Sequence, residues 1–223
     1  MKCVCTKNNN PQQEDNMIKK DLLPSVFGGV YISIGALIYL VLEKSVTGAL
    51  FFSLGILLCI FCNGHLFTRA FPLGVYTRFQ EYSVRQILIV YAGNFIGTAL
   101  MALLISQTFL NDRIADLTIA VAQAKISDTF ISTLISGTFA GLLVAFAVMF
   151  KRRGMNILFV VVTIAAFVIL GFDHCIANMF YYGVYTVNGG ALNIALILDI
   201  LAATLGNMIG GGLACLIEPR ESK

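Results

Sequence analysis

Charged residues are scarce in this sequence, and their scarcity excludes most soluble folds. Asp, Glu, Lys and Arg make up 12% of the 223 residues, whereas hydrophobic residues make up 58%. A soluble domain of this length exposes far more charge. The net charge of +3 is small and scattered, which argues against nucleic-acid binding. The composition therefore predicts a polytopic protein embedded in the lipid bilayer.

Metal-ligating residues are also few, which argues against a metal site and against an intramembrane enzyme. The chain has two histidines, and among its six cysteines Cys59 and Cys62 have a CxxC spacing without a second cluster near them. Small buried hydrophobic side chains explain that pair better. No glycine-rich phosphate loop is present in the sequence. We predict no metal, no cofactor and no enzymatic activity.

Hydrophobic segments fill most of the chain, enough for six membrane spans of about 20 residues each. They cover residues 24–42, 46–77, 85–109, 127–150, 155–185 and 193–217. The second and fifth are too long for one simple span, and polar residues interrupt them at Cys62–Arg69 and Gly171–Phe180. Backbone that leaves the helix at membrane depth persists only where it is buried in protein or lines water. We therefore predict that the second and fifth helices are broken.

A short repeat relates the two halves of the chain. The sequence GNFIG at residues 93–97 recurs as GNMIG at residues 206–210. The asparagines of these repeats, Asn94 and Asn207, are interpreted as inter-helix hydrogen-bonding residues beside close glycine packing. Three spans in each half force the halves into opposite orientations. The prediction is an all-α membrane protein of six transmembrane helices in an inverted 3+3 repeat.

The distribution of Lys and Arg predicts the orientation of the chain. With the N-terminus inside, the cytoplasmic segments contain Lys2, Lys7, Lys19, Lys20, Arg69, Arg78, Arg85, Lys151, Arg152, Arg153, Arg220 and Lys223. The outer segments contain Lys44, Arg113 and Lys125. The N-terminal residues lack the apolar core of a signal peptide. We expect a cytoplasmic tail at residues 1–23, a channel domain at 24–217 and a cytoplasmic tail at 218–223, in the plasma membrane.

The polar island at Gly171–Phe180 contains the strongest candidate residues for function. Asp173 and His174 stand side by side in it, and Asn178 follows. Ionisable groups at bilayer depth are costly unless they line a cavity or meet a partner, and imidazole exchanges a proton near neutral pH. The alternative is a structural histidine bonded to a neighbouring carbonyl or to Asn178. The adjacent carboxylate favours the functional interpretation.

Three further residues are weaker candidates. Lys125 lies at the entrance to the fourth predicted span, where it either attracts anions or snorkels to water. Taken alone, its sequence context favours snorkelling. Thr68 and His65 lie in the other interruption. The Thr68 hydroxyl either bonds a passing solute or satisfies freed backbone, and His65 is equally explained as a helix-end residue. The interruption in the first half recurs in the second half, with His65 in one and His174 in the other, so the two histidines are matched.

These motifs resemble the formate/nitrite transporter family. The resemblance extends from about Ser25 to Ile217 and is carried by FSLGILLC at Phe52–Cys59, LFT at Leu66–Thr68, Lys125, the island at Gly171–Phe180 and GNMIGGGL at Gly206–Leu213. It implies an aquaporin-like subunit of six spans, assembled as a homopentamer with one pore in each protomer. Family members move small monovalent anions of weak acids, such as formate, nitrite and hydrosulfide.

The resemblance also assigns roles by motif. His174 would be the central pore histidine, Thr68 the loop threonine beside it, and Lys125 the vestibule lysine that attracts anions, which reverses the preference from the sequence alone. The hydrophobic constrictions would be Leu66, Phe52, Ile56 and Phe167. Because a bare anion pays a large desolvation penalty in an apolar constriction, its protonated form crosses more easily. The proton would come from solvent or through His174, which predicts pH-dependent transport.

The sequence departs from the family pattern at several positions. Asp173 stands where the family usually has Glu, His65 where a carboxylate usually precedes LFT, and Gly141 where the fourth span commonly carries Asn. Tryptophan, common in the third and fourth spans of the family, is absent. These departures indicate a divergent branch, with the hydrosulfide type among the candidates.

Two other functions are open alternatives. One is an aquaporin-like channel for neutral small solutes, which the absence of Asn-Pro-Ala loops disfavours. The other is a non-transporting membrane scaffold, in which the polar breaks would be structural.

Overall fold

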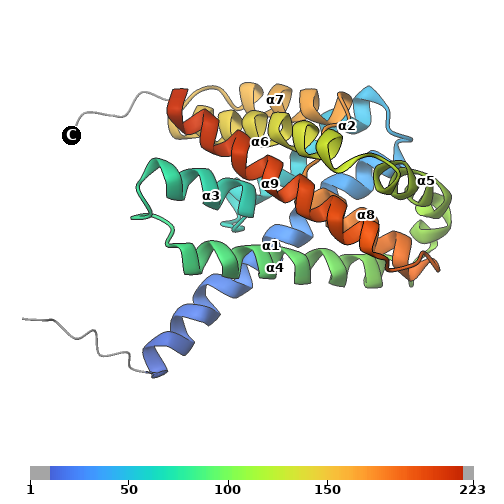
Figure 1. Cartoon of the computed structure of the whole chain (residues 1–223), viewed down its shortest axis with the longest axis horizontal. Coiled ribbons are helices and arrows are strands. Elements are labelled where there is room, and N and C mark those ends of the chain that lie inside the picture. Colours follow the sequence, from blue (N-terminus) through green and yellow to red (C-terminus); the bar gives the residue numbers. More distant parts are fainter. Residues whose placement is uncertain (1–10, 218–223) are drawn as a thin grey trace, which may run out of the picture.

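The computed structural model describes residues 11–217 of the chain, and throughout this range its regular structure is helical (Figure 1). The helices are α1 (Pro11–Val41), α2 (Val46–Phe61), α3 (Phe67–Tyr76), α4 (Val84–Ile105), α5 (Phe109–Ile126), α6 (Phe130–Arg152), α7 (Ile157–Ile169), α8 (Cys175–Val187) and α9 (Ile194–Ile217). The predicted all-α class is confirmed. Residue 24, where the predicted tail gives way to the first span, lies inside α1. The rest of the predicted tails, at residues 1–10 and 218–223, lies outside the described residues.

Within residues 20–217, four helices are long and apolar enough to cross a membrane. They are the segments Lys20–Val41, Val84–Ile105, Phe130–Arg152 and Ile194–Ile217. Helices α2 and α7 are apolar but shorter, with 16 and 13 residues. At about 1.5 Å per residue, neither alone reaches across a hydrocarbon layer about 30 Å thick. Each is followed by a break and by a second short helix, α3 or α8.

The two breaks follow from residues that end a helix. Gly171 has a φ of 72°, and the amide of Phe172 donates to the carbonyl of Phe167 at 3.1 Å, which is the hydrogen bond of a glycine C-cap. At the other break Asn63 has a φ of 55°. Asparagine tolerates this left-handed conformation better than most residues. The predicted interruptions are therefore present, at residues 62–66 and 170–174.

The two short helices run in opposite directions from the middle of the molecule. Figure 1 shows α3 running towards the end where α9 finishes, and α8 running towards the end where α5 lies. The long helices cross closely beside them. A β-carbon added to Gly97 would overlap the carbonyl oxygen of Val26 in α1, and one added to Gly210 would overlap that of Thr138 in α6. Glycine therefore permits the close α1–α4 and α6–α9 contacts.

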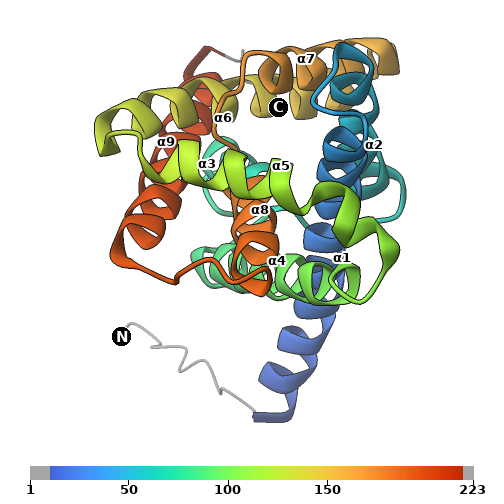
Figure 2. The same ribbon diagram turned by 90° about the vertical axis from the view of Figure 1, so that its right-hand side faces the viewer.

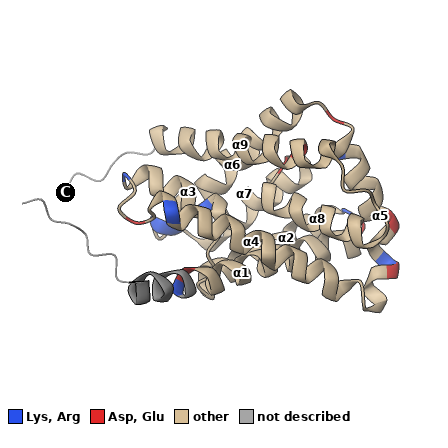
Figure 3. Ribbon diagram, turned by 60° about the horizontal axis from the view of Figure 1, so that its bottom comes forward, with Lys and Arg blue, Asp and Glu red and all other residues tan. Residues whose placement is uncertain are grey.

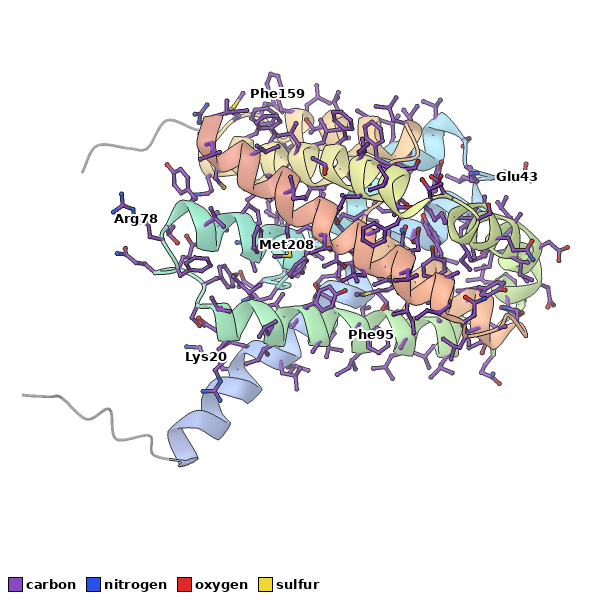
Figure 4. The ribbon with its side chains drawn as sticks, in the orientation of Figure 1. Lys20, Glu43, Arg78, Phe95, Phe159 and Met208 are labelled. Carbon is purple, nitrogen blue, oxygen red and sulfur yellow. The ribbon has the colours of Figure 1, made fainter. Side chains whose placement is uncertain are left out.

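The surface separates apolar sides from polar ends. Phe95 and Phe159, both exposed, point outward from opposite long sides of the molecule (Figure 4). Arg78 and Lys20 lie towards one end, here called the α3 end, and Glu43 lies at the opposite, α5 end. Lys and Arg gather around the α3 end, whereas basic and acidic residues mix at the α5 end (Figure 3). Apolar sides and charged ends are the arrangement expected of a protein that spans a bilayer.

Helix α5 lies across one end of the molecule, between the third and fourth predicted spans (Figure 2). The sequence analysis did not predict this helix. Its buried residues Ile114, Thr118 and Ala122 recur at a spacing of four residues, so the helix is amphipathic. The prediction also placed Lys125 at the entrance to the fourth span. The structure instead places it in the last turn of α5, before α6 begins at Phe130.

Candidate functional site

A cavity of about 440 Å³ opens near the α5 end and reaches towards the centre of the molecule. Helices α1, α2, α5, α6, α7 and α8 contribute to its wall. Of the predicted site and constriction residues, it gathers Phe52, Lys125, Phe167, Asp173, His174 and Asn178. Leu66, Thr68 and Ile56 do not line it; all three are buried beyond it. The polar island and the vestibule lysine, distant in sequence, thus face one space.

His174 lies at the inner part of the site and also begins α8. Its Nδ1 accepts a hydrogen bond from the backbone N–H of Ala177 at 3.3 Å, so the ring caps the helix. Its Nε2 lies 2.9 Å from Oγ1 of Thr68. Because Nδ1 is an acceptor, the ring proton is on Nε2, which donates to Thr68. The Thr68 hydroxyl proton is then available for another acceptor.

Aromatic rings surround the histidine on the cavity side. The ring of Phe167 stacks on that of His174 with centroids 5.8 Å apart, and Phe52 meets Phe167 edge-on at 5.7 Å. On the far side, Leu66 precedes α3 and is 1% exposed. Ile56, also buried, lies one helical turn after Phe52 on α2. The imidazole therefore stands among apolar side chains.

Lys125 forms an ion pair with Asp173 at the wall of the cavity. Their side chains are 17% and 8% exposed. The second carboxylate oxygen of Asp173 accepts a hydrogen bond from Oγ of Ser136 at 2.6 Å, and Asn178 donates to the first at 3.0 Å. The lysine therefore does not simply snorkel to water. It is held over the cavity by a carboxylate that is itself fixed by two donors.

A second buried carboxylate, which the sequence analysis missed, stands behind this wall. Asp199 of α9 is 6% exposed and accepts hydrogen bonds from Thr133 at 3.0 Å, from Asn178 at 3.3 Å and from the Tyr182 hydroxyl. The amide of Asn178 thus bridges Asp173 and Asp199. A single aspartate within the otherwise apolar IALILDILAATLG segment was the signal that could have found it.

Asn94 of α4 holds the first break in place. Its Oδ1 accepts from the backbone N–H of Phe67 at 2.8 Å. Its Nδ2 donates to the carbonyls of Ser25 at 2.7 Å and His65 at 2.8 Å. The amide therefore satisfies two backbone groups at the break, those of Phe67 and His65, and ties them to the carbonyl of Ser25 within α1.

Asn207 of α9 makes the same set of bonds at the second break. Its Oδ1 accepts from the N–H of Cys175 at 2.9 Å, and its Nδ2 donates to the carbonyls of Gly137 at 2.8 Å and Asp173 at 2.7 Å. The inter-helix bonding predicted for both asparagines is confirmed. We call Asn94 and Asn207 the clamp asparagines.

The clamp asparagines correct one predicted correspondence. The carbonyl held by Asn94 belongs to His65, and the carbonyl held by Asn207 belongs to Asp173. His65 therefore corresponds to Asp173, and the prediction that it corresponds to His174 is wrong. The two histidines were matched because they are the same residue type. The backbone carbonyls bound by the clamp asparagines instead align His65 with Asp173.

His65 itself lies away from the cavity. Its ring meets that of Tyr82 edge-on at 5.8 Å, and within the described part of the chain its buried Nδ1 has no hydrogen-bond partner. Its backbone N–H donates to the carbonyl of Pro24 at 3.0 Å. These contacts favour the helix-end interpretation. Among residues 20–217, no three His, Cys, Asp or Glu side chains converge where a metal could bind.

Comparison with known proteins places these features in a family context. The model of the family described as Formate/nitrite transporter matches residues 8–217. Formate channel FocA of Escherichia coli (strain K12) is 29% identical over 231 residues, covering 85% of this chain and 81% of that protein. A Formate-nitrite transporter of Entamoeba histolytica is 24% identical over 213 residues, covering 84% of this chain and 59% of that protein.

Solved structures are similar as well. A pentameric formate channel with formate bound superposes with a TM-score of 0.73 at 25% identity, covering 89% of this chain and 94% of that one. An FNT family ion channel superposes with a TM-score of 0.78 at 20% identity, covering 91% and 89%. The second likeness concerns the fold alone.

Proposed function

The chain belongs to the formate/nitrite transporter family, and we propose that it forms a pH-dependent channel for small monovalent anions of weak acids: formate, nitrite or hydrosulfide. Proteins of this family are channels or transporters, and this one is not an enzyme. The observation that carries the proposal is the cavity that joins Lys125 to the His174–Thr68 contact. The relatives named as formate channels support formate as the first substrate to test.

Lys125 attracts the anion to the cavity. Its ammonium has three N–H donors, of which the ion pair with Asp173 uses one. The remaining donors are available to a solute in the cavity that Lys125 lines. The carboxylate of Asp173 cancels the net charge of Lys125, so the pair exerts little attraction on a distant anion. Attraction therefore acts at short range, by direct hydrogen bonding, rather than as a long-range field.

Beyond the lysine, the apolar wall favours the protonated solute. Phe52 and Phe167 leave a bare anion without hydrogen-bond donors, so the anion pays a desolvation penalty that its conjugate acid largely avoids. The first turns of α3 and α8 meet at this point through Thr68 and His174. Because the N-terminus of a helix carries partial positive charge, the two ends stabilise a solute that keeps some negative charge.

Thr68 and His174 act together on the solute. With the imidazole N–H donated to Thr68, the threonine hydroxyl donates its own proton to an oxygen or sulfur of the solute. Because Nε2 already carries a proton, a second proton can bind the His174 ring only at Nδ1. Proton transfer through His174 therefore requires the hydrogen bond from the N–H of Ala177 to Nδ1 to break. The proton therefore comes from solvent while the cap is closed, and through His174 when it opens.

The membrane architecture belongs to the same proposal. We propose six spans in an inverted 3+3 repeat with an aquaporin-like protomer: α1, α2 with α3, and α4, followed by α6, α7 with α8, and α9. The matching bonds of the clamp asparagines support this pairing. A channel domain at 24–217 stands in the plasma membrane as a homopentamer, with tails 1–23 and 218–223 in the cytoplasm. The pentameric solved channel supports the assembly.

The test is flux of formate, nitrite and hydrosulfide into proteoliposomes across a series of external pH values. His174→Asn is the informative variant, because asparagine also caps a helix N-terminus but does not titrate. His65→Asn is the matched control, since His65 lies outside the cavity. We expect saturable uptake that rises as external pH falls, altered by His174→Asn and unaffected by His65→Asn.

Two results would refute the proposal. If folded wild-type oligomer moves none of the three anions, a neutral-solute channel or a non-transporting scaffold becomes the better account. If flux occurs but His174→Asn leaves both its rate and its pH dependence unchanged, the histidine has no part in it.

A further inference from the structure

A second, smaller cavity of about 60 Å³ lies towards the α3 end of the molecule. Its lining comes from α2, α3 and α6, and consists of Ile60, Arg69, Leu73, Val148, Lys151 and Arg152. Half of these residues are cations. The volume suffices for a few water molecules, and so for an anion of two to four heavy atoms. No motif in the sequence assigned a function to this group.

The small cavity lies further along α2 than the large cavity does, and it also reaches α3. On α2, Phe52 lines the large cavity and Ile60 the small one, with buried Ile56 between them. Residues spaced by four lie on one face of a helix, and eight residues cover about 12 Å along it. On α3, Arg69 lines the small cavity and follows Thr68, which contacts His174. The two cavities therefore lie on opposite sides of the Thr68–His174 contact.

Within the described residues, one of the three cations of the small cavity has a carboxylate partner. Arg152 pairs with Glu81 at 2.8 Å. Arg69 is half-buried, and its guanidinium forms no ion pair or hydrogen bond with the described part of the chain. Asp21 of α1 does not pair with Arg69 either, and its carboxylate accepts a hydrogen bond from Gln86. A half-buried cation without a counter-charge is costly unless water or an anion solvates it.

Aromatic rings hold the other two cations at the cavity. The Lys151 ammonium lies 5.1 Å from the ring centre of Phe61, and the Arg152 guanidinium lies 5.8 Å from that of Tyr76. Both contacts are in the range of cation–π attraction. Figure 3 shows that this end of the molecule is also where Lys and Arg gather. The cations are therefore positioned side chains and not only a solvated helix end.

We infer that Arg69, Lys151 and Arg152 form a second anion-binding mouth, at the end of the pore opposite to Lys125. The inference rests on the proposed function in taking the two cavities as one pore. The two mouths differ in charge: Lys125 is neutralised by Asp173, whereas Arg69 keeps its charge. The solute class is a small monovalent anion, and the mouth at the α3 end concentrates it more strongly.

The test measures the local potential directly and needs no transport. Ile60→Cys places a thiol in the small cavity, in a protein whose Cys3, Cys5 and Cys62 are replaced by Ser; Cys59, Cys175 and Cys215 are buried. The rates of modification by an anionic and a cationic methanethiosulfonate reagent are compared. We expect the anionic reagent to be favoured, and Arg69→Gln to lower the ratio of the two rates about fivefold.

Matched variants separate charge from structure. Arg69→Lys keeps the charge and should keep the ratio, and Arg78→Gln removes an exposed cation of the same end that lies outside the cavity. Should Arg69→Gln fail to fold, Lys151→Gln at the exposed end of α6 gives the same test. Added formate should slow the anionic reagent, and about 1 M salt should abolish the difference between the reagents.

The outcomes for the second mouth and for the transport function are distinct. A rate ratio that Arg69→Gln and Lys151→Gln both leave unchanged overturns the second mouth, even if wild-type protein conducts formate. A shifted ratio in a protein that moves no anion keeps the anion site and refutes the transport proposal. In a conducting protein, Arg69→Gln should raise KM about threefold for anions supplied at the α3 end and leave KM at the α5 end unchanged.

Discussion

Replacing Asn207 by alanine tests whether the clamp asparagines hold the breaks together. The side chain is 3% exposed and makes three hydrogen bonds to backbone groups, at 2.9, 2.8 and 2.7 Å. Alanine removes all three bonds. It also leaves the N–H of Cys175 and the carbonyls of Gly137 and Asp173 buried without this partner.

The magnitude follows from those bonds. Inter-helix hydrogen bonds in membranes contribute about 0.6 kcal/mol each on average, which sets a lower bound of about 2 kcal/mol for three. A buried backbone group left unsatisfied costs about 1–3 kcal/mol, which raises the expected loss to about 5 kcal/mol. The control is Asn156→Ala, because Asn156 caps α7 with one hydrogen bond to the amide of Leu158, an exposed contact. Its expected cost is about 1 kcal/mol.

The assay is reversible unfolding in mixed micelles with a rising fraction of SDS, followed by circular dichroism because the chain contains no tryptophan. We expect Asn207→Ala to lower the free energy of unfolding by about 2–5 kcal/mol and Asn94→Ala to lower it similarly. If Asn207→Ala costs no more than Asn156→Ala, the bonds to the break do not stabilise the fold, and the reasoning is refuted.

Three further substitutions probe the site. Asp173→Asn removes the charge that neutralises Lys125, so KM for anions supplied at the α5 end should fall about two- to fivefold in concentration-dependent uptake; an unchanged KM contradicts this. Gly141→Ala places a methyl group against the backbone of Asn207 and should cost about 1–3 kcal/mol of unfolding free energy in the same SDS titration, so a neutral result would mean that the helices separate easily. Thr68→Val leaves the imidazole N–H without its acceptor and should lower the maximal flux about tenfold at unchanged folding, an effect that must be absent if the hydroxyl is only structural.

Features of the fold that depend on local sequence were predictable. Hydrophobic runs located the long helices, and the residues that end α2 and α7, Asn63 and Gly171, lie in the polar interruptions that the sequence displays. Helix α5 was missed because its apolar residues form a stripe and not a run. The stripe Leu110, Ile114, Leu117 and Val121, spaced by three and four residues, was the signal to look for.

The sequence indicated which residues belong to the site, but it did not indicate which of them contact one another. His174, Asp173 and Asn178 stood out because polar residues are rare at membrane depth. Lys125 lies 48 residues from Asp173 in sequence, and no local pattern indicates that they pair. Asp199 was missed for a related reason, since its role depends on donors from two other helices, Thr133 of α6 and Asn178 and Tyr182 of α8.

The clamp asparagines also bear on how the chain enters the membrane. Helices α3 and α8, of 10 and 13 residues, are too short to cross the bilayer alone. Each is held by an asparagine that is synthesised later: Asn94 follows Phe67 by 27 residues and Asn207 follows Cys175 by 32. During translation, each short helix therefore emerges before its anchor exists. Its backbone ends stay unsatisfied until the next long helix is inserted, so the unit that the insertion machinery must accept is the pair and not the single helix.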